Sequence, residues 1–212
     1  MNILTYPLGY LRLKDEDGRH LYRRNLLALV ALTAIVSVPF IITDANFFDD
    51  KGFLDRIGSF SAVLTGFYIA ALVGIASFSA AIGDLDEEIV VGPISREAAN
   101  GGHENLTRRQ YVCALFGYLS FVSLIISLGS ILLIVLGGAR ADVLMLLKEF
   151  PRITAFASTA TGLIRDAVVI ICSLVVSHMF VTTCHGLYYM IDRLYHKEAE
   201  MLKKPTATAS EA

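Results

Sequence analysis

Several residue types are scarce in this 212-residue chain. It has no tryptophan, and only 18% of its residues are charged. Lys and Arg number 18 against 20 Asp and Glu, so the net charge of −2 argues against direct nucleic-acid binding. The cysteines are Cys113, Cys172 and Cys184, all within apolar stretches. Their odd number and the absence of CxxC or Cys/His spacing argue against a disulfide framework or a metal site.

Motifs that are typical of enzymes are also missing. The chain has no GxSxG, no HExxH, no glycine-rich phosphate loop and no paired carboxylates inside an apolar run. No segment outside the apolar runs is long enough for a separate enzyme domain. The sequence therefore favours a binding or assembly role over catalysis, and we expect neither a cofactor nor a metal ion.

Apolar residues are abundant, at 55% of the chain, whereas soluble domains usually hold about 45–50%. They gather in four runs without Asp, Glu, Lys or Arg, at 26–43, 57–83, 111–138 and 167–191. Each run reaches the roughly 18–20 residues that a helix needs to cross a bilayer. The sequence predicts an all-α integral membrane protein, with a four-helix membrane domain over 26–191 between an N-terminal segment 1–25 and a tail 192–212.

The distribution of Lys and Arg predicts the orientation of the four spans. Twelve of these residues lie in 1–25, 84–110 and 192–212, and six lie in the other two loops. Cytoplasmic segments are richer in positive charge. We therefore expect both termini to face the cytoplasm.

The segments at the cytoplasmic side predict a small cap. Asp17-Gly18 is a hairpin turn signal, and 88–95 is a candidate third strand. The alternative is a segment that lies on the membrane surface, with Tyr6, Tyr10 and Tyr22 near the lipid headgroups. Residues 100–105 are expected to be a flexible connector. Thr107 and Gln110 then have the spacing of a capping box at the start of the third helix.

An acidic cluster follows the second span directly. Its carboxylates are Asp84, Asp86, Glu87 and Glu88, which oppose the dipole at a helix C-terminus. One interpretation is a docking patch for a basic partner or a weak site for a hard divalent cation. The other is a solvated turn whose charge is balanced by nearby arginines, which are Arg23, Arg24, Arg108 and Arg109.

Two spans carry stripes of small or hydroxylated residues. In the second, Ala62, Gly66, Ala70 and Gly74 recur every four residues, a spacing that lets membrane helices pack closely. In the third, Ser120, Ser123, Ser127 and Ser130 share one face. This face is interpreted either as a pore lining or as a tight helix seam with hydroxyls bonded to carbonyls one turn back.

The fourth span contains two histidines, His178 and His185. They lie about 10 Å apart along one helix face, which is too far for both to bind one small ion. A pair of haem ligands would need a symmetric dimer. His178 lies near the middle of the span, where ionisable groups are usually functional. We consider proton-linked gating and a neutral ring bonded to a serine of a neighbouring helix, and place His185 at the interface with Tyr188 and Tyr189.

The segment between the third and fourth spans has two parts. Residues 141–150 are amphipathic and are expected to lie on the membrane surface. Residues 152–164, after Pro151, are expected to extend the fourth helix or to re-enter the membrane.

In size, in its four spans and in its short cytoplasmic ends, the chain resembles the small four-span membrane subunits of bacterial anti-phage defence systems such as Kiwa. The resemblance implies an oligomeric inner-membrane sensor or anchor that signals to a cytoplasmic effector. The cap and the acidic cluster would be its docking surfaces. The expected partners are the lipid bilayer, copies of the same chain and a cytoplasmic protein. The alternative function is a homo-oligomeric channel that permeabilises or depolarises the membrane.

Overall fold

The structure, a computed structural model, describes residues 7–15, 18–23, 25–43, 45–48, 51–77, 83–86, 88–89, 93–97, 103–147 and 151–201. The side chains at 83–84, 97, 103, 138–161 and 190–201 lie outside this description. Glu87, Arg24, Tyr6 and the tail from 202 onward, all part of the predictions above, also lie outside it.

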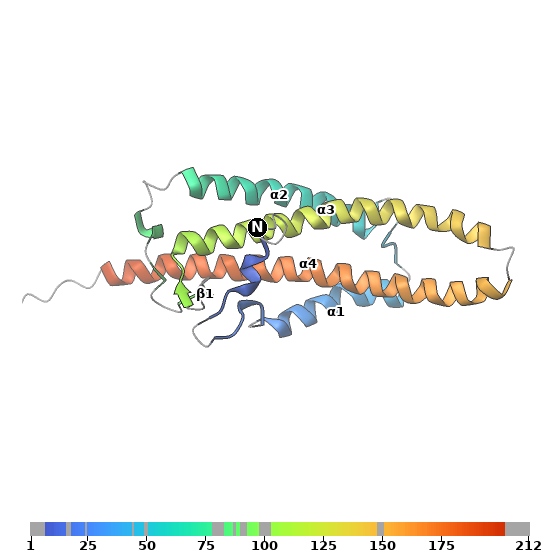
Figure 1. The fold of residues 1–212 in the computed structure, drawn as a ribbon, viewed down its shortest axis with the longest axis horizontal. Coiled ribbons are helices and arrows are strands. Elements are labelled where there is room, and N and C mark those ends of the chain that lie inside the picture. Colours follow the sequence, from blue (N-terminus) through green and yellow to red (C-terminus); the bar gives the residue numbers. More distant parts are fainter. Residues whose placement is uncertain are drawn as a thin grey trace, which may run out of the picture.

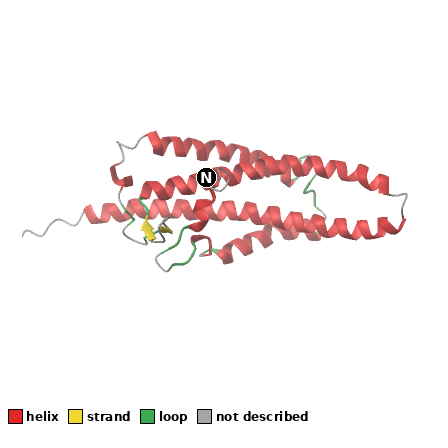
Figure 2. Cartoon of the chain, viewed as in Figure 1, coloured by secondary structure: helices red, strands yellow, loops and turns green. Residues whose placement is uncertain are grey.

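Four helices dominate the chain (Figure 2). They are α1 (Leu26–Ile42), α2 (Phe53–Ser77), α3 (Arg108–Leu147) and α4 (Pro151–Met201). They alternate in direction and lie side by side in the order α2, α3, α4, α1, so α1 packs on α4 rather than on α2 (Figure 1). This order leaves much of each apolar helix surface without a partner from the same chain.

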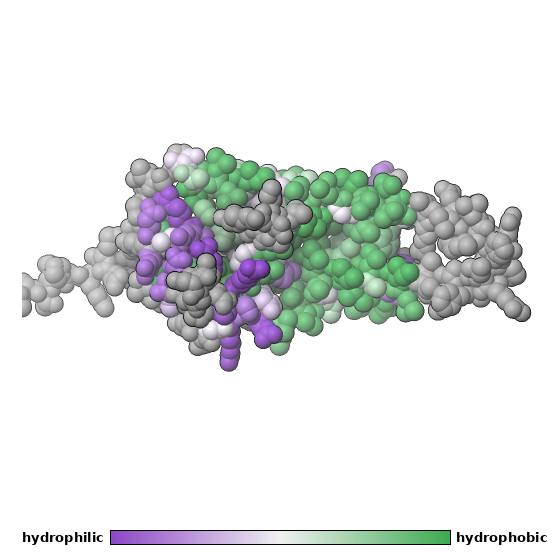
Figure 3. All heavy atoms as spheres, in the orientation of Figure 1, coloured by the Kyte–Doolittle hydropathy of each residue, from purple (hydrophilic) through white to green (hydrophobic). Residues whose placement is uncertain are grey.

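Three of the helices are long and apolar enough to cross a membrane, over Phe53–Ser77, Arg108–Gly137 and Gly162–Tyr189. The fourth predicted span is the shorter apolar helix α1, which has 17 residues. Pro39 lies in its last turn, as its late position in the run suggests, and the helix ends three residues later. Apolar side chains form a continuous belt, and hydrophilic ones gather at one end (Figure 3).

The segment after the third span differs in part from the prediction. Residues 141–147 continue α3 and do not form a separate helix, and α4 begins at Pro151. Proline suits the first helical position because its missing N–H has no partner there anyway. The interpretation of 152–164 as an extension of the fourth helix is confirmed.

The contact between α2 and α3 is close because small and hydroxylated residues face each other. Gly58 of α2 lies against Ser130 of α3, where a Cβ would come within 1.9 Å of the serine Oγ. Farther along, Thr65 Oγ1 and Ser123 Oγ are 2.8 Å apart. Tyr68 reaches past α3, and its hydroxyl lies 3.0 Å from Thr183 Oγ1 of α4. Hydrogen bonds therefore link α2 to both of the other long helices.

The contact between α1 and α4 has a similar composition. Thr33 and Ser37 are the buried polar residues of α1, and Ser173 and Ser177 are buried on α4. The helices are antiparallel and meet at Asn25 and His185, so equal steps along both bring these two pairs to similar levels. Small side chains at these levels let the two backbones approach closely.

Phenylalanines close the helix ends opposite the cap. Phe47, in the link between α1 and α2, is almost fully buried. Its ring packs against Phe40, Phe48 and Phe53 at centroid distances of 5.0, 4.8 and 5.4 Å. Leu54 and Val169 complete this cluster, which joins the link to α2 and α4.

The other end carries the cap, which we define as the described parts of 7–23 and 83–107. It contains the short 3-10 helices η1 (Pro7–Arg12), η2 (Leu21–Arg23) and η3 (Gly83–Asp86), and the antiparallel strands β1 (Ser95–Glu97) and β2 (His103–Asn105) (Figure 1). β2 lies within the predicted flexible connector, so that prediction is wrong for these three residues.

The predicted turn and third strand are present in reduced form. Gly18 has a φ of +71°, which glycine tolerates best, and its N–H donates to the carbonyl of Asp15. Lys14 exchanges backbone hydrogen bonds with Ser95, both 3.0 Å long. Among the described residues of 88–95, Ser95 forms the bridge to the N-terminal turn.

Candidate functional site

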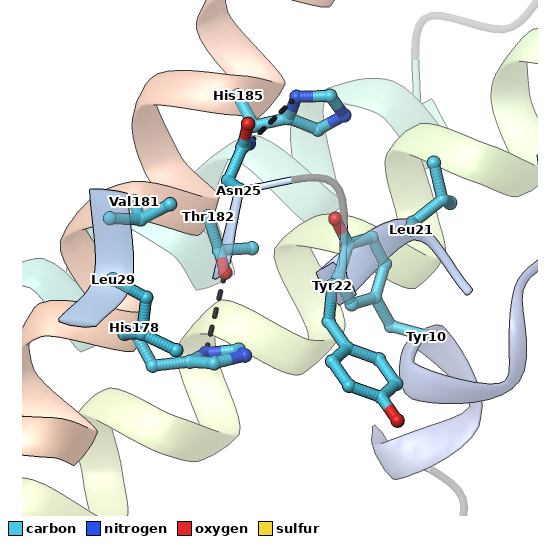
Figure 4. Close-up of a pocket in the computed structure, with 9 residues that line it drawn as sticks. All are labelled: Tyr10, Leu21, Tyr22, Asn25, Leu29, His178, Val181, Thr182 and His185. Atoms are coloured by element: carbon cyan, nitrogen blue, oxygen red, sulfur yellow. Dashed lines mark hydrogen bonds between the residues drawn. The ribbon is translucent and has the colours of Figure 1, made fainter. Parts of the chain in front are cut away.

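His178 lies on α4 and is half-buried between α3 and the cap (Figure 4). Its Nδ1 is 3.3 Å from the hydroxyl of Tyr118 and 3.4 Å from Oγ1 of Thr182. Among the described residues, the partners of this ring are a tyrosine and a threonine rather than the serine considered from the sequence. Since one ring nitrogen faces both hydroxyls, they compete for the same hydrogen bond.

Aromatic rings connect this histidine to the cap. Tyr118 meets the imidazole edge to face at 5.8 Å and stacks on Tyr10 of η1 at 5.1 Å. Tyr10 also packs against Tyr111, which contacts Tyr189 of α4 at 4.6 Å. We call these five residues the ring cluster. It joins the cap, α3 and α4 in one buried contact.

Burial sets the ionisation of Tyr10. Its side chain is almost fully buried, and the loss of water raises the pKa of its hydroxyl from 10.0 to about 12. The cap interpretation is therefore favoured over the surface segment for this residue, because Tyr10 packs against protein rather than standing at an exposed boundary.

A small hollow lies beside His178. Its volume is about 20 Å³, which is room for one water molecule. Side chains from the cap, α1 and α4 converge on it (Figure 4). Its lining is Tyr10, Leu21, Tyr22, Asn25, Leu29, His178, Val181, Thr182 and His185. The polar groups in this lining make it a suitable place for a bound water.

His185 lies on α4 seven residues beyond His178, about two turns closer to the cap end. Its Nδ1 is 3.4 Å from the amide Nδ2 of Asn25, at the start of α1. The two predicted histidines thus line the same hollow but bond to different elements. Among the described residues, no three His, Cys, Asp or Glu side chains come together as a metal site would require.

The serines of α3 form a helix seam. The hydroxyls of Ser120, Ser123 and Ser130 donate to carbonyls one turn back, at 2.9, 3.0 and 2.8 Å. Ser123 is 0% exposed and faces Thr65 of α2. Ser127 is half-buried and accepts the bond from Ser130 through its carbonyl. Within a single chain, Ser123 and Ser130 of this face pack against α2.

The acidic cluster is only partly described. The carboxylate of Asp86 pairs with Arg109, with Oδ1 at 2.9 Å from Nε, although the Asp86 side chain is 68% exposed. Glu88 is also exposed and forms a backbone bridge with Thr107. Glu87 and the side chain of Asp84 lie outside the described residues. For Asp86, charge balance by an arginine is confirmed.

The small-residue stripe of α2 faces away from the other helices. Ala62, Gly66 and Ala70 are exposed and Gly74 is half-buried. A Cβ on either glycine would meet nothing within 4 Å. The residues that pack on α3 belong to a different face, which includes Gly58, the position where a Cβ would collide with Ser130.

Three contributors to the site were not predicted, namely the roles of Tyr10, Tyr118 and Asn25. One signal was present in the sequence. Tyr111 and Tyr118 are seven residues apart, as are His178 and His185, so each pair lies on one face of its helix. Antiparallel packing of α3 and α4 brings Tyr118 onto His178, whereas Tyr111 meets Tyr189 and His185 lies against Asn25.

No protein-family model, curated protein or solved structure matches the chain. The class of protein is therefore assigned from the fold of the chain itself. It is a helical protein with three helices long and apolar enough to span a membrane, a shorter apolar helix and a small cap at one end.

Proposed function

We propose that the protein is a membrane-embedded sensor or anchor that acts through a cytoplasmic protein. Its helices occupy the bacterial inner membrane, and the cap and both termini face the cytoplasm. The excess of Lys and Arg in the cap-side segments supports this orientation. We place the protein in anti-phage defence because its layout resembles that of the four-span membrane subunits of such systems.

The ring cluster is the observation that carries this proposal. It joins the cap to α3 and α4 through stacked and edge-on contacts, with Tyr10 from the cap at its centre. Aromatic pairs of this kind add about 0.5–1.5 kcal/mol each to the burial of their surface. A movement of α4 against α3 changes the contact of His178 with Tyr118, the ring on which Tyr10 stacks. The cap is thus mechanically coupled to the helices.

Docking and assembly use the surfaces that the chain leaves uncovered. The acidic cluster presents Asp86 and Glu88 at the cap, where a basic cytoplasmic partner can reach them. The outward stripe of α2, with Gly66 at its centre, suits close approach by a second copy of the chain. The channel alternative has less support, because Ser123 and Ser130 are buried against α2.

Affinity purification of the tagged protein from its native membranes tests the docking proposal. Mass spectrometry should identify a stoichiometric cytosolic protein with the wild-type chain. Reversal to lysine of Asp84, Asp86, Glu87 and Glu88 should remove that protein while leaving membrane insertion intact. The matched control reverses the four acidic residues at the opposite end of the helices, which are Asp44, Asp49, Asp50 and Asp55. If the partner survives the first reversal, the docking site is elsewhere.

A further inference from the structure

A groove between α1 and α4 opens on the outside of the helices, next to the small hollow. Its volume is about 530 Å³, which lies in the usual range of 300–1,000 Å³ for ligand sites. Asn25, Val181 and His185 form part of both the groove and the hollow (Figure 4). The described residues of its lining are Asn25, Ala28, Leu32, Phe180, Val181, Cys184, His185 and Tyr188.

Polar and apolar side chains are separated along this groove. Asn25, His185 and Tyr188 lie at its cap end. Leu32 lies seven residues deeper than Asn25, and Phe180 lies five residues deeper than His185 and eight deeper than Tyr188. Seven residues of helix correspond to about 10 Å. The groove thus changes from polar to apolar in the direction that runs from the cap toward the middle of the helices. This gradient matches an amphiphile with its headgroup at the cap.

The charge around the polar end favours an anion. Among the residues that the structure describes, no Asp or Glu belongs to the groove lining. The exposed Arg23 lies two residues before Asn25, and residues 1–25 contain five Lys or Arg against three Asp or Glu. Basic pockets between membrane helices on the cytoplasmic side are typical sites for anionic lipid headgroups.

We propose that this groove binds an anionic phospholipid from the cytoplasmic leaflet. One acyl chain lies along Leu32 and Phe180, and the phosphate lies near Asn25, His185 and Arg23. The inference rests on the proposed membrane placement. Because the groove and the hollow share three residues, the bound lipid contacts the same side chains that line the space beside His178.

Lipid retention by the full-length protein tests this proposal. The protein is reconstituted in vesicles of phosphatidylcholine with or without phosphatidylglycerol, extracted in mild detergent, and weighed by native mass spectrometry. One phosphatidylglycerol should stay bound in preference to phosphatidylcholine. A single basic residue near the headgroup gives roughly a fivefold preference, so Arg23→Gln should reduce the preference by about that factor.

Two tryptophan variants separate the groove from general lipid contact. Ala28→Trp fills the groove and should abolish retention. Val30→Trp is the matched control, because Val30 is exposed on α1 but lies outside the groove lining. Circular dichroism verifies that both variants fold. Equal retention of the two lipids, or retention that Ala28→Trp leaves unchanged, would overturn the proposal.

The exposed Cys184 gives a second, independent readout. In a chain with Cys113→Ala and Cys172→Ala, phosphatidylglycerol should slow maleimide modification of Cys184 severalfold. Protection that follows the protein-to-lipid ratio instead of the lipid type would assign the groove to a second copy and refute lipid binding. Failure of the protein to float with the vesicles would instead count against the proposed membrane placement.

Discussion

Of the glycines that the structure describes, Gly58 is the one where an added methyl group should disrupt the helix packing most. A Cβ there would lie 1.9 Å from Ser130 Oγ and 2.8 Å from Ser130 Cβ, whereas ordinary contacts start at 3.4 Å. Relief of the closer contact requires about 1.5 Å of movement, which either separates α2 from α3 or breaks the bond from Ser130 to the Ser127 carbonyl. Overpacking of this kind costs about 1–3 kcal/mol.

The expected result is that Gly58→Ala lowers the free energy of unfolding by that amount. Gly66→Ala is the matched control on the same helix, since its Cβ would meet nothing within 4 Å. In monomeric protein, where the proposed contact of Gly66 with a second copy is absent, it should be neutral or stabilising by up to about 1 kcal/mol, because alanine favours helix over glycine. Unfolding by SDS in mixed micelles, followed by circular dichroism, suits a chain without tryptophan.

A double-mutant cycle tests the cause. Ser130→Gly removes both atoms that the new Cβ would strike, so the double variant should recover most of the loss, with a coupling energy of at least about 1 kcal/mol. If Gly58→Ala is as stable as Gly66→Ala, or if Ser130→Gly fails to rescue it, the packing assigned to α2 and α3 is wrong.

Three further results are expected. Phe47→Ala should destabilise the protein by about 3 kcal/mol or more in SDS unfolding, because it leaves a cavity at a buried site. Phe60→Ala is the control and should change the unfolding curve little, because this side chain is 54% exposed. Arg109→Gln should cost less than about 1 kcal/mol, and the loss should shrink in salt, because its partner Asp86 is mostly exposed. Burial raises the pKa of Tyr10 from 10.0 to about 12. The stabilisation from the protonated Tyr10 hydroxyl is therefore complete below pH 10 and is lost at about 1.4 kcal/mol per pH unit as the pH rises toward 12. Tyr10→Phe should reduce this loss in unfolding curves measured across that range.

Local patterns in the sequence predicted the helices and the start signal of α3 well. The runs without charge correspond to the four helices, because burial and lipid contact both require apolar side chains. The capping box at the start of α3 is confirmed, with Thr107 N–H donating to Gln110 Oε1 at 3.1 Å and Gln110 N–H donating to Thr107 Oγ1 at 3.3 Å. These interactions act within one turn of helix, so spacing alone specifies them.

Contacts between helices were much less predictable. Small residues indicate that a helix face allows close approach, but they do not identify the neighbour. On α2, the stripe through Gly66 and the face through Gly58 both qualify, and only the second meets α3. The ring cluster depends on the order of the helices in space and on the position of η1 over α3. Neither is encoded in the spacing of Tyr118 or His178 alone.

The side of the membrane on which the cap lies is the most direct test of the account. Glu104 in β2 is exposed, and Asp55 lies at the opposite end of the helices, in the first turn of α2. In a chain whose three native cysteines are replaced by alanine, Glu104→Cys should react with an impermeant maleimide only after the inner membrane is opened. Asp55→Cys should react in intact spheroplasts. Labelling of Glu104→Cys in intact spheroplasts, or of both positions only after lysis, would contradict a membrane-spanning protein with a cytoplasmic cap.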